Sequence, residues 1–238
     1  MKPFHTIFQT ALAAQAAVAL LTFAAAPGAS AQTFGPHLTQ AASTARGPAT
    51  NGFLQRWLVL EPIRVQIRSN AQLVDSFVQA TLKKDYFTNQ FTVIPHDGDK
   101  VTVNGTELAW HAVDSSVYNV NLYHFAIALG KPQFNVVFWA VTIVNCPEEI
   151  PNVRLAVGSN AASIWWVNGK EVIDLYGDIH MKLDDGVSKR FTLHKGSNIV
   201  RCAVINSPGV SDFCARFLDT EDKPVLTGFT LSVEGINQ

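Results

Sequence analysis

The sequence predicts an all-β protein, an antiparallel β-sandwich with one short helix. Two Asn-Gly pairs, Asn104-Gly105 and Asn168-Gly169, each stand between runs of strand-forming residues. Asn-Gly in this setting is the strongest short hairpin signal, because both central residues of a type I′ turn need positive φ. Apolar residues alternate with polar or small ones at 153–157, and many short strands follow one another with turn residues between them. This spacing is typical of a sandwich or barrel rather than of βαβ units.

The expected strands follow from β-rich runs that end at Gly, Pro, Asn or Asp. The first run, 53–60, stops at Glu61-Pro62, and the most apolar run is 137–144. The remaining expected strands are 91–94, 100–103, 153–157, 164–167, 172–175, 188–193, 199–205, 213–218 and 228–233. Residues 72–83 instead carry apolar side chains at helical spacing, with Asp75-Ser76 in the first turn, and predict the one short helix.

The N-terminus predicts export. Lys2 and His5 precede an apolar run at 11–23, and the small-x-small pattern Ala29-Ser30-Ala31 follows. This is the layout of a cleaved signal peptide over 1–31. A stretch of this length is short for a membrane span, which takes about 20 apolar residues. We expect a secreted or periplasmic protein with no transmembrane span after cleavage.

The domain organisation follows from composition. Residues 32–50 are rich in Ala, Thr, Gly and Pro and lack apolar periodicity, so we expect a flexible leader there. Residues 51–238 are expected to form a single β-sandwich domain. The chain has 18 Lys+Arg against 19 Asp+Glu, with no basic cluster longer than two residues. Nucleic acid is therefore not an expected partner, because phosphate contacts need a basic face.

Four phrases, in order, resemble the galactose-binding-like jelly-roll domains of extracellular carbohydrate-active proteins. They are residues 57–62 (WLVLEP), 157–172 (from VGSNA to WVNGKEV), 184–185 (DD) and 193–200 (LHKGSNIV). The likeness covers roughly 53–233. Glu61 stands where the family phrase has Gly, and Asn160-Ala161 stands where it has an acidic pair. The resemblance implies a jelly-roll sandwich, often attached to glycoside hydrolases or carbohydrate esterases, that either binds sugar or is purely structural.

The hairpin at 164–175 supplies the first candidate sugar site. Alternate side chains of a strand point to opposite faces, so Trp165 and Trp166 cannot both enter the same core. One is expected between the sheets; the other lies outside, as an aromatic face for a sugar ring, or is packed under a loop. The residues we expect to contribute, here and after the first Asn-Gly turn, are Trp166, Asn168, Tyr176, Asp178 and His180, with Trp110 and His111 as a second group.

Catalytic and metal sites have little support in the sequence. There is no Gly-x-Ser-x-Gly elbow, and no two acids can be assigned to the facing carboxylates of a glycosidase. No catalytic residue is therefore expected, and the sequence favours a non-catalytic protein over an enzyme. Residues 96–99 and 183–186 offer oxygen ligands, so a structural calcium ion is an alternative to plain turn chemistry there. The scattered His residues give no metal-ligand spacing for zinc.

Cys202 and Cys214 flank a loop centred near Pro208. If the loop joins a hairpin, the two residues lie opposite each other and could form a disulfide; the alternative is two buried thiols. Cys146 would remain free.

Three functions stay open. The first is an exported, non-catalytic module that binds a polysaccharide or oligosaccharide and acts alone or beside another exported enzyme. The second is a structural or protein-interaction sandwich without a sugar site, which predicts that Trp110, Trp165 and Trp166 are all buried. The third and least favoured is a small glycan hydrolase.

Overall fold

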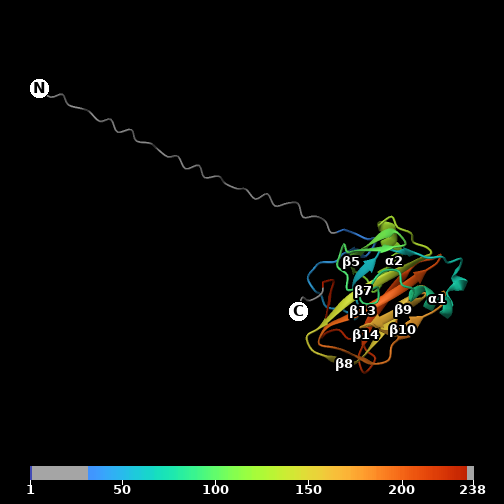
Figure 1. Cartoon of the computed structure of the whole chain (residues 1–238). Helices are drawn as coiled ribbons and strands as arrows, with labels where there is room; N and C mark the ends of the chain where they lie inside the picture. The colour runs from blue at the N-terminus through green and yellow to red at the C-terminus, as the bar shows by residue number, and fades with distance from the viewer. Residues whose placement is uncertain (2–31, 235–238) are drawn as a thin grey trace. The chain divides into compact units, whose positions relative to one another are not determined.

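The computed structural model describes Met1 and residues 32–234, which include two β-sheets and two α-helices (Figure 1). The expected signal peptide, residues 1–31, lies outside the described residues. The two sheets pack face to face around a shared core, so the predicted all-β sandwich is confirmed. Among the described helices, none is long and apolar enough to cross a membrane.

The larger sheet has ten strands in the order β1-β5-β2-β7-β13-β9-β10, with β4 on β5 and with β3 and β15 on β7. Every pairing in it is antiparallel. Its strands are β1 (Leu38–Gln40), β2 (Arg56–Leu60), β3 (Ile63–Arg64), β4 (Lys100–Val103), β5 (Thr106–Ser115), β7 (Val136–Cys146), β9 (Ser163–Val167), β10 (Lys170–Leu175), β13 (Gly196–Asn206) and β15 (Thr230–Ser232).

Both predicted Asn-Gly hairpins are confirmed. Val103 pairs with Thr106 across the first turn, and Val167 pairs with Lys170 across the second. Asn104 and Asn168 have φ of 49° and 50°, and both following glycines have φ of 78°. Positive φ at both central residues is the type I′ requirement, which Asn and Gly meet at low cost.

The smaller sheet has five strands in the order β11-β8-β14-β6, with β12 also on β8. They are β6 (Val120–Asn121), β8 (Ile150–Ser159), β11 (Gly186–Val187), β12 (Phe191–Leu193) and β14 (Asp212–Leu218). The inner core between the two sheets contains Trp57, Phe138 and Trp165 from the larger sheet and Phe213 and Phe217 from the smaller one.

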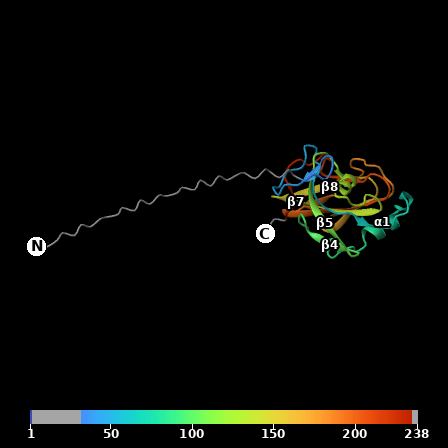
Figure 2. The same cartoon turned by 90° about the horizontal axis from the view of Figure 1, so that it is seen from above.

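An outer layer covers the other face of the larger sheet. It consists of a short 3-10 turn at Asn70–Gln72, helix α1 (Asp75–Leu82) and the irregular chain that runs on to β4 (Figures 1 and 2). Leu73, Val78 and Leu82 pack there against the outward-facing side chains of the sheet. Helix α1 lies within the predicted 72–83. The expected strand at 91–94 is wrong, because this segment forms turns in the cover.

A second helix, α2 (Leu122–Ala128), was not predicted. Its sequence is rich in aromatic and branched residues, which favour strands. The helix begins because the Asn121 side chain accepts a hydrogen bond from the His124 N–H at 2.8 Å. Phe125 and Ala126 then bury its inner face.

The expectation of a flexible leader at 32–50 is corrected. Leu38–Gln40 pair with β5, and Phe34 and Leu38 are fully buried in the inner core. The Arg46 backbone also exchanges hydrogen bonds with Leu231. Sparse but large apolar residues hold this segment, so the lack of apolar periodicity did not mean a lack of packing.

The possible disulfide between Cys202 and Cys214 is also corrected. Both are free and buried, as is Cys146. Cys202 lies in β13 of the larger sheet and Cys214 in β14 of the smaller one. The loop between them therefore crosses from one sheet to the other and does not form the hairpin that would have placed the two sulfurs side by side.

Candidate functional site

The two adjacent tryptophans of β9 point to opposite faces, as the alternation predicts, and both are buried. Trp165 enters the inner core, where its ring lies 6.2 Å from that of Trp57 and 5.5 Å from that of Phe213. Its indole N–H donates to the Ser163 hydroxyl at 3.0 Å. Trp165 is therefore a packing residue with its polar atom satisfied.

Trp166 does not provide an exposed sugar platform. Its ring stacks on Trp139 with centroids 5.6 Å apart and planes inclined by 16°, and Phe91 of the outer layer covers it. Only 6% of Trp166 is exposed, and Trp110 on the same face is fully buried beside Phe87. The sugar-binding roles expected for Trp166 and Trp110 are wrong, because the 65–99 segment covers the face on which they lie.

A buried arginine helps to hold this cover in place. The Arg201 guanidinium, on β13, donates to the Gln90 carbonyl at 2.8 Å and to the Val93 carbonyl at 2.6 Å. Burial lowers the pKa of Arg201 to about 10. The side chain remains charged at neutral pH and fixes the irregular 90–93 backbone above the tryptophans.

Asn168 and His111 are likewise engaged within the fold. The Asn168 side chain donates to the Asn198 side-chain oxygen Oδ1 at 2.9 Å and accepts from the Ile199 N–H at 2.8 Å, which ties the hairpin to β13. The His111 ring packs against both Phe34 and Phe125, with ring centroids 5.4 and 5.7 Å away, and those two rings also contact each other. The structure places neither beside the remaining predicted site residues.

Tyr176, Asp178 and His180, the other three predicted residues, do come together, at the end of β10. They line two adjoining pockets that share Asn70 and Asp178, and we call the pair the hairpin-end groove. One pocket, of about 550 Å³, is lined by Asn70, Ala71, Leu73, Val74, Asp75, Tyr176, Gly177 and Asp178. The other, of about 240 Å³, is lined by Asn70, Asn160, Ala161, Asp178, His180, Asn206, Pro208, Gly209 and Val210.

Backbone hydrogen bonds position the loop that carries these residues. The Gly177 N–H donates to the Leu73 carbonyl at 2.8 Å, and the Ala161 N–H donates to the Ile179 carbonyl at 2.9 Å. The loop is thus attached to the outer layer on one side and to the β8–β9 turn on the other. Asp178 and His180 remain exposed between these attachments.

The polar atoms of the groove are unevenly satisfied. The Asn70 amide nitrogen donates to the Pro208 carbonyl at 3.4 Å, whereas its buried carbonyl oxygen has no hydrogen-bond partner within the described residues. The Tyr176 hydroxyl donates to Asp174 at 2.5 Å and accepts from Gln79. Burial, together with the Asp174 carboxylate, raises the pKa of Tyr176 to about 12, so the hydroxyl keeps its proton.

The acidic clusters that suggested calcium are engaged in other contacts. Asp184 pairs with Arg216, and Asp185 lies 3.1 Å from the Lys182 ammonium. Within residues 32–234, no group of three or more His, Cys, Asp or Glu side chains forms a metal-binding arrangement.

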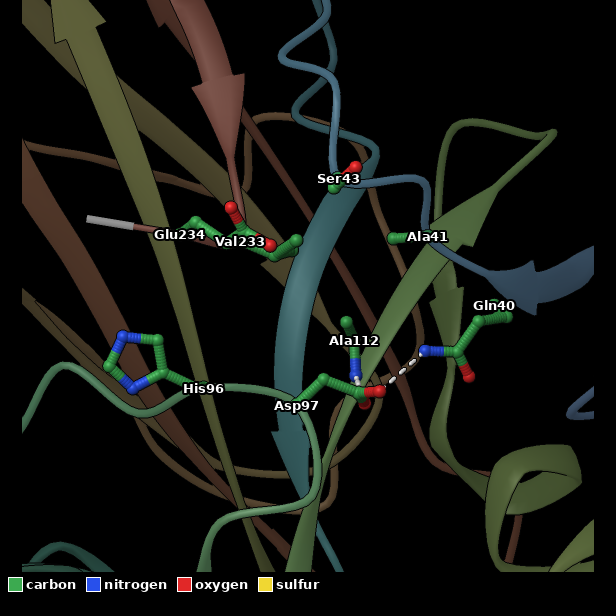
Figure 3. Close-up of a pocket in the computed structure, with 8 residues that line it drawn as sticks. All are labelled: Gln40, Ala41, Ser43, His96, Asp97, Ala112, Val233 and Glu234. Carbon is green, nitrogen blue, oxygen red and sulfur yellow. Dashed lines mark hydrogen bonds between the residues drawn. The ribbon is translucent and has the colours of Figure 1, made fainter. Parts of the chain in front are cut away.

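Asp97 lies in a separate pocket of about 440 Å³ between the first strand and the end of β15 (Figure 3). Its carboxylate accepts from the Gln40 amide at 2.8 Å and from the Ala112 N–H at 2.7 Å. Figure 3 shows the carboxylate turned toward these two donors and the His96 ring turned away. Asp97 therefore links the N-terminal segment to β5, a structural role for this acid.

One partly exposed aromatic pair has no signal in the sequence. Tyr123 on α2 lies 5.9 Å from Phe134, and 42% of Phe134 is exposed. Because α2 itself was not predicted, no pattern signalled that these two rings would meet at the surface.

No protein-family model matches the chain, and no curated protein matches its sequence. Solved structures that show some similarity to the chain include the PA14 sugar-binding domain of an RTX adhesin, with 12% identity and a TM-score of 0.39, over 74% of this chain and 96% of that one. The PA14 domain of an antifreeze protein has 13% identity and a TM-score of 0.42, over 76% and 93%. A β-glucosidase from Kluyveromyces marxianus has 16% identity and a TM-score of 0.36, over 75% of this chain and 19% of that enzyme.

The jelly-roll resemblance in the sequence implied a β-sandwich, and the two hydrogen-bonded sheets of this chain form one.

Proposed function

We propose that this chain is an exported, non-catalytic module that binds a polysaccharide or oligosaccharide in the hairpin-end groove. Residues 1–31 would direct it to the periplasm or the cell exterior. There it would act alone or beside another exported enzyme. The proposal assigns the sugar contacts to Asp178, His180, Tyr176 and Asn70.

The observation that carries the proposal is the composition of the groove around Asn70 and Asp178. Sugars present polar rims and apolar C–H faces, so a sugar site combines hydrogen-bonding side chains with an aromatic or apolar wall. The groove offers a carboxylate at Asp178, an imidazole at His180, an amide at Asn70 and the part-exposed ring of Tyr176. The Asn70 side-chain oxygen, which has no hydrogen-bond partner among residues 32–234, supports the assignment, because an acceptor without a hydrogen bond gains from a ligand hydroxyl.

The test is binding of the full chain to a panel of soluble and insoluble polysaccharides, measured by calorimetry and by pull-down. Tryptophan fluorescence is a poor readout, because Trp110, Trp165 and Trp166 lie away from solvent. Asp178→Ala should weaken binding by about 10-fold or more, the loss of a charged hydrogen bond. The matched control is Asp85→Ala, since Asp85 is exposed and does not line the groove. Equal binding by both variants would contradict the assignment.

A second function, a structural or protein-docking sandwich, is favoured by one observation. Trp110, Trp165 and Trp166 are all buried, which this alternative predicts. The same panel separates the two functions. Failure of the full chain to bind any polysaccharide would favour the docking module and direct the search to an exported protein partner.

A further inference from the structure

A small, largely apolar pocket lies beside the turn of the β4–β5 hairpin. Its volume is about 270 Å³. The walls come from the chain around β3, from the tip of the β4–β5 hairpin and from the segment that follows α2. The apolar side chains lining it are Pro62, Ile63, Val103, Leu108 and Pro132.

Two cationic side chains, Arg64 and Lys131, also line this pocket. Lys131 is fixed by Glu61, whose carboxylate lies 2.9 Å from the ammonium. Glu61 is itself buried and held by the Ala109 N–H at 3.3 Å. The ammonium of Lys131 is thus held beside the apolar walls and does not move freely in solvent.

Arg64 has no such counter-charge. Within residues 32–234, no carboxylate lies within ion-pairing distance of its guanidinium. The two cations, Arg64 and Lys131, outnumber the single carboxylate of Glu61, so the basic side chains at the pocket exceed the acidic ones by one. An exposed arginine over apolar walls favours an anion with an apolar body, because the guanidinium fork matches a carboxylate in a bidentate contact.

We propose that this pocket binds a small carboxylic acid with an aromatic or branched apolar body. The carboxylate contacts Arg64 and Lys131, and the apolar body packs on Ile63, Val103 and Leu108. The pocket is slightly smaller than the range of about 300–1,000 Å³ typical of small-molecule sites, which limits the ligand to roughly the size of one ring. The site is separate from the hairpin-end groove and does not depend on the proposed glycan binding.

The experiment is a calorimetric titration of the full chain with benzoate and with benzamide, its neutral isostere. We expect saturable binding of benzoate, with benzamide weaker by about 10-fold or more, since only the anion forms charge-assisted hydrogen bonds. Comparable affinities for the two, or no saturable benzoate binding up to about 10 mM, would overturn the proposal.

Variants of Arg64 test whether benzoate binds in this pocket. Arg64→Gln should weaken benzoate binding by about 10-fold or more and leave benzamide binding unchanged. The benzoate affinity of Arg64→Lys should lie between those of Arg64→Gln and the wild type, because lysine keeps the charge but lacks the planar two-pronged donor group. Arg68→Gln is the matched control, an exposed arginine four residues along that does not line this pocket. Arg64 is exposed, so its variants should keep the wild-type melting temperature. An equal loss in Arg68→Gln and Arg64→Gln would show a general charge effect and overturn the assignment.

Discussion

The two faces of the larger sheet bury the same kind of side chain by different means. The inner face carries Trp165 and is covered by a second sheet whose strands are hydrogen-bonded along their length. The outer face carries Trp166 and is covered by one short helix and irregular chain, held in part by Arg201. Two neighbouring tryptophans are thus both buried, although one lies under a hydrogen-bonded sheet and the other under largely irregular chain.

The largest expected effect separates the two tryptophans. Trp165→Ala should lower the free energy of unfolding by about 3–5 kcal/mol, because the fully packed inner core cannot collapse into the space left behind. Trp166→Ala should cost less, since the irregular cover can settle onto the stacked Trp139 ring. Denaturant unfolding of both variants measures the two losses of stability. A larger loss of unfolding free energy in Trp166→Ala than in Trp165→Ala would contradict this comparison.

The second prediction concerns the outer layer that covers Trp166. Arg201→Met keeps the length of the side chain but removes the donors to the Gln90 and Val93 carbonyls, at a cost of about 1–3 kcal/mol. The loss should be local, with faster amide exchange at 86–94 and unchanged exchange in β8 and β14. The control is Lys195→Met, whose exposed pair with Glu148 should contribute little. Uniform faster exchange across both sheets would show that the outer layer does not open independently.

Two buried carboxylates should respond to pH with opposite signs. Burial raises the pKa of Asp212, against the hydrogen bond from Asn119, so its folded state binds the proton more tightly than the unfolded chain. Stability from this group is therefore highest at low pH and falls as pH rises from about 3.9, the ordinary Asp value, through the raised folded pKa. Asp212→Asn should stabilise the protein at pH 7, as a thermal melt would measure.

Glu61 provides the opposite case. Burial alone would raise the pKa of Glu61, but hydrogen bonds from Lys131 and the Ala109 N–H and the Lys131 charge together lower it. Its stabilisation is complete above about 4.3, the ordinary Glu value, and is lost as pH falls through the lowered folded pKa. Glu61→Gln should destabilise the protein at pH 7, and the variant should lack the loss of stability that Glu61 protonation causes at acid pH. The same sign in Glu61→Gln and Asp212→Asn would contradict the assigned environments.

The smallest expected effect concerns the thiols. Burial raises the pKa of Cys146 and Cys202, and that of Cys214 to about 12, so none is a thiolate at neutral pH. A thiol reagent should react with none of the three in the native protein and with all three in denaturant. Rapid labelling of any one in the native state would reveal an opening that the packed sheets do not provide.

The sequence was most informative where local chemistry decides the structure. Asn104-Gly105 and Asn168-Gly169 demand positive φ, and both hairpins formed where expected. The outer layer could not be predicted in the same way, because residues 84–99 have no regular period and their burial depends on partners distant in the chain. Phe91 illustrates this: the sequence predicts a strand at 91–94, whereas in the structure Phe91 lies in a turn and covers Trp166.

The candidate site was predicted in part for the same reason. Tyr176, Asp178 and His180 follow a correctly placed strand, so their proximity could be expected from the hairpin alone. Asn70, which joins the two pockets of the groove, lies more than a hundred residues away and carried no signal. For Trp110 and Trp166 the sequence leaves open whether the side chain is exposed or packed under a loop, because alternation shows which face a side chain takes and not what covers that face.

The most direct test is a comparison of Asp178→Ala with Trp166→Phe in titrations with the polysaccharide that the full chain binds best. We predict that Asp178→Ala lowers affinity by about 10-fold or more without changing the melting temperature, while Trp166→Phe leaves affinity unchanged. Retained affinity in Asp178→Ala with loss in Trp166→Phe would place the sugar on the outer face and contradict this account, as would the absence of binding to every polysaccharide.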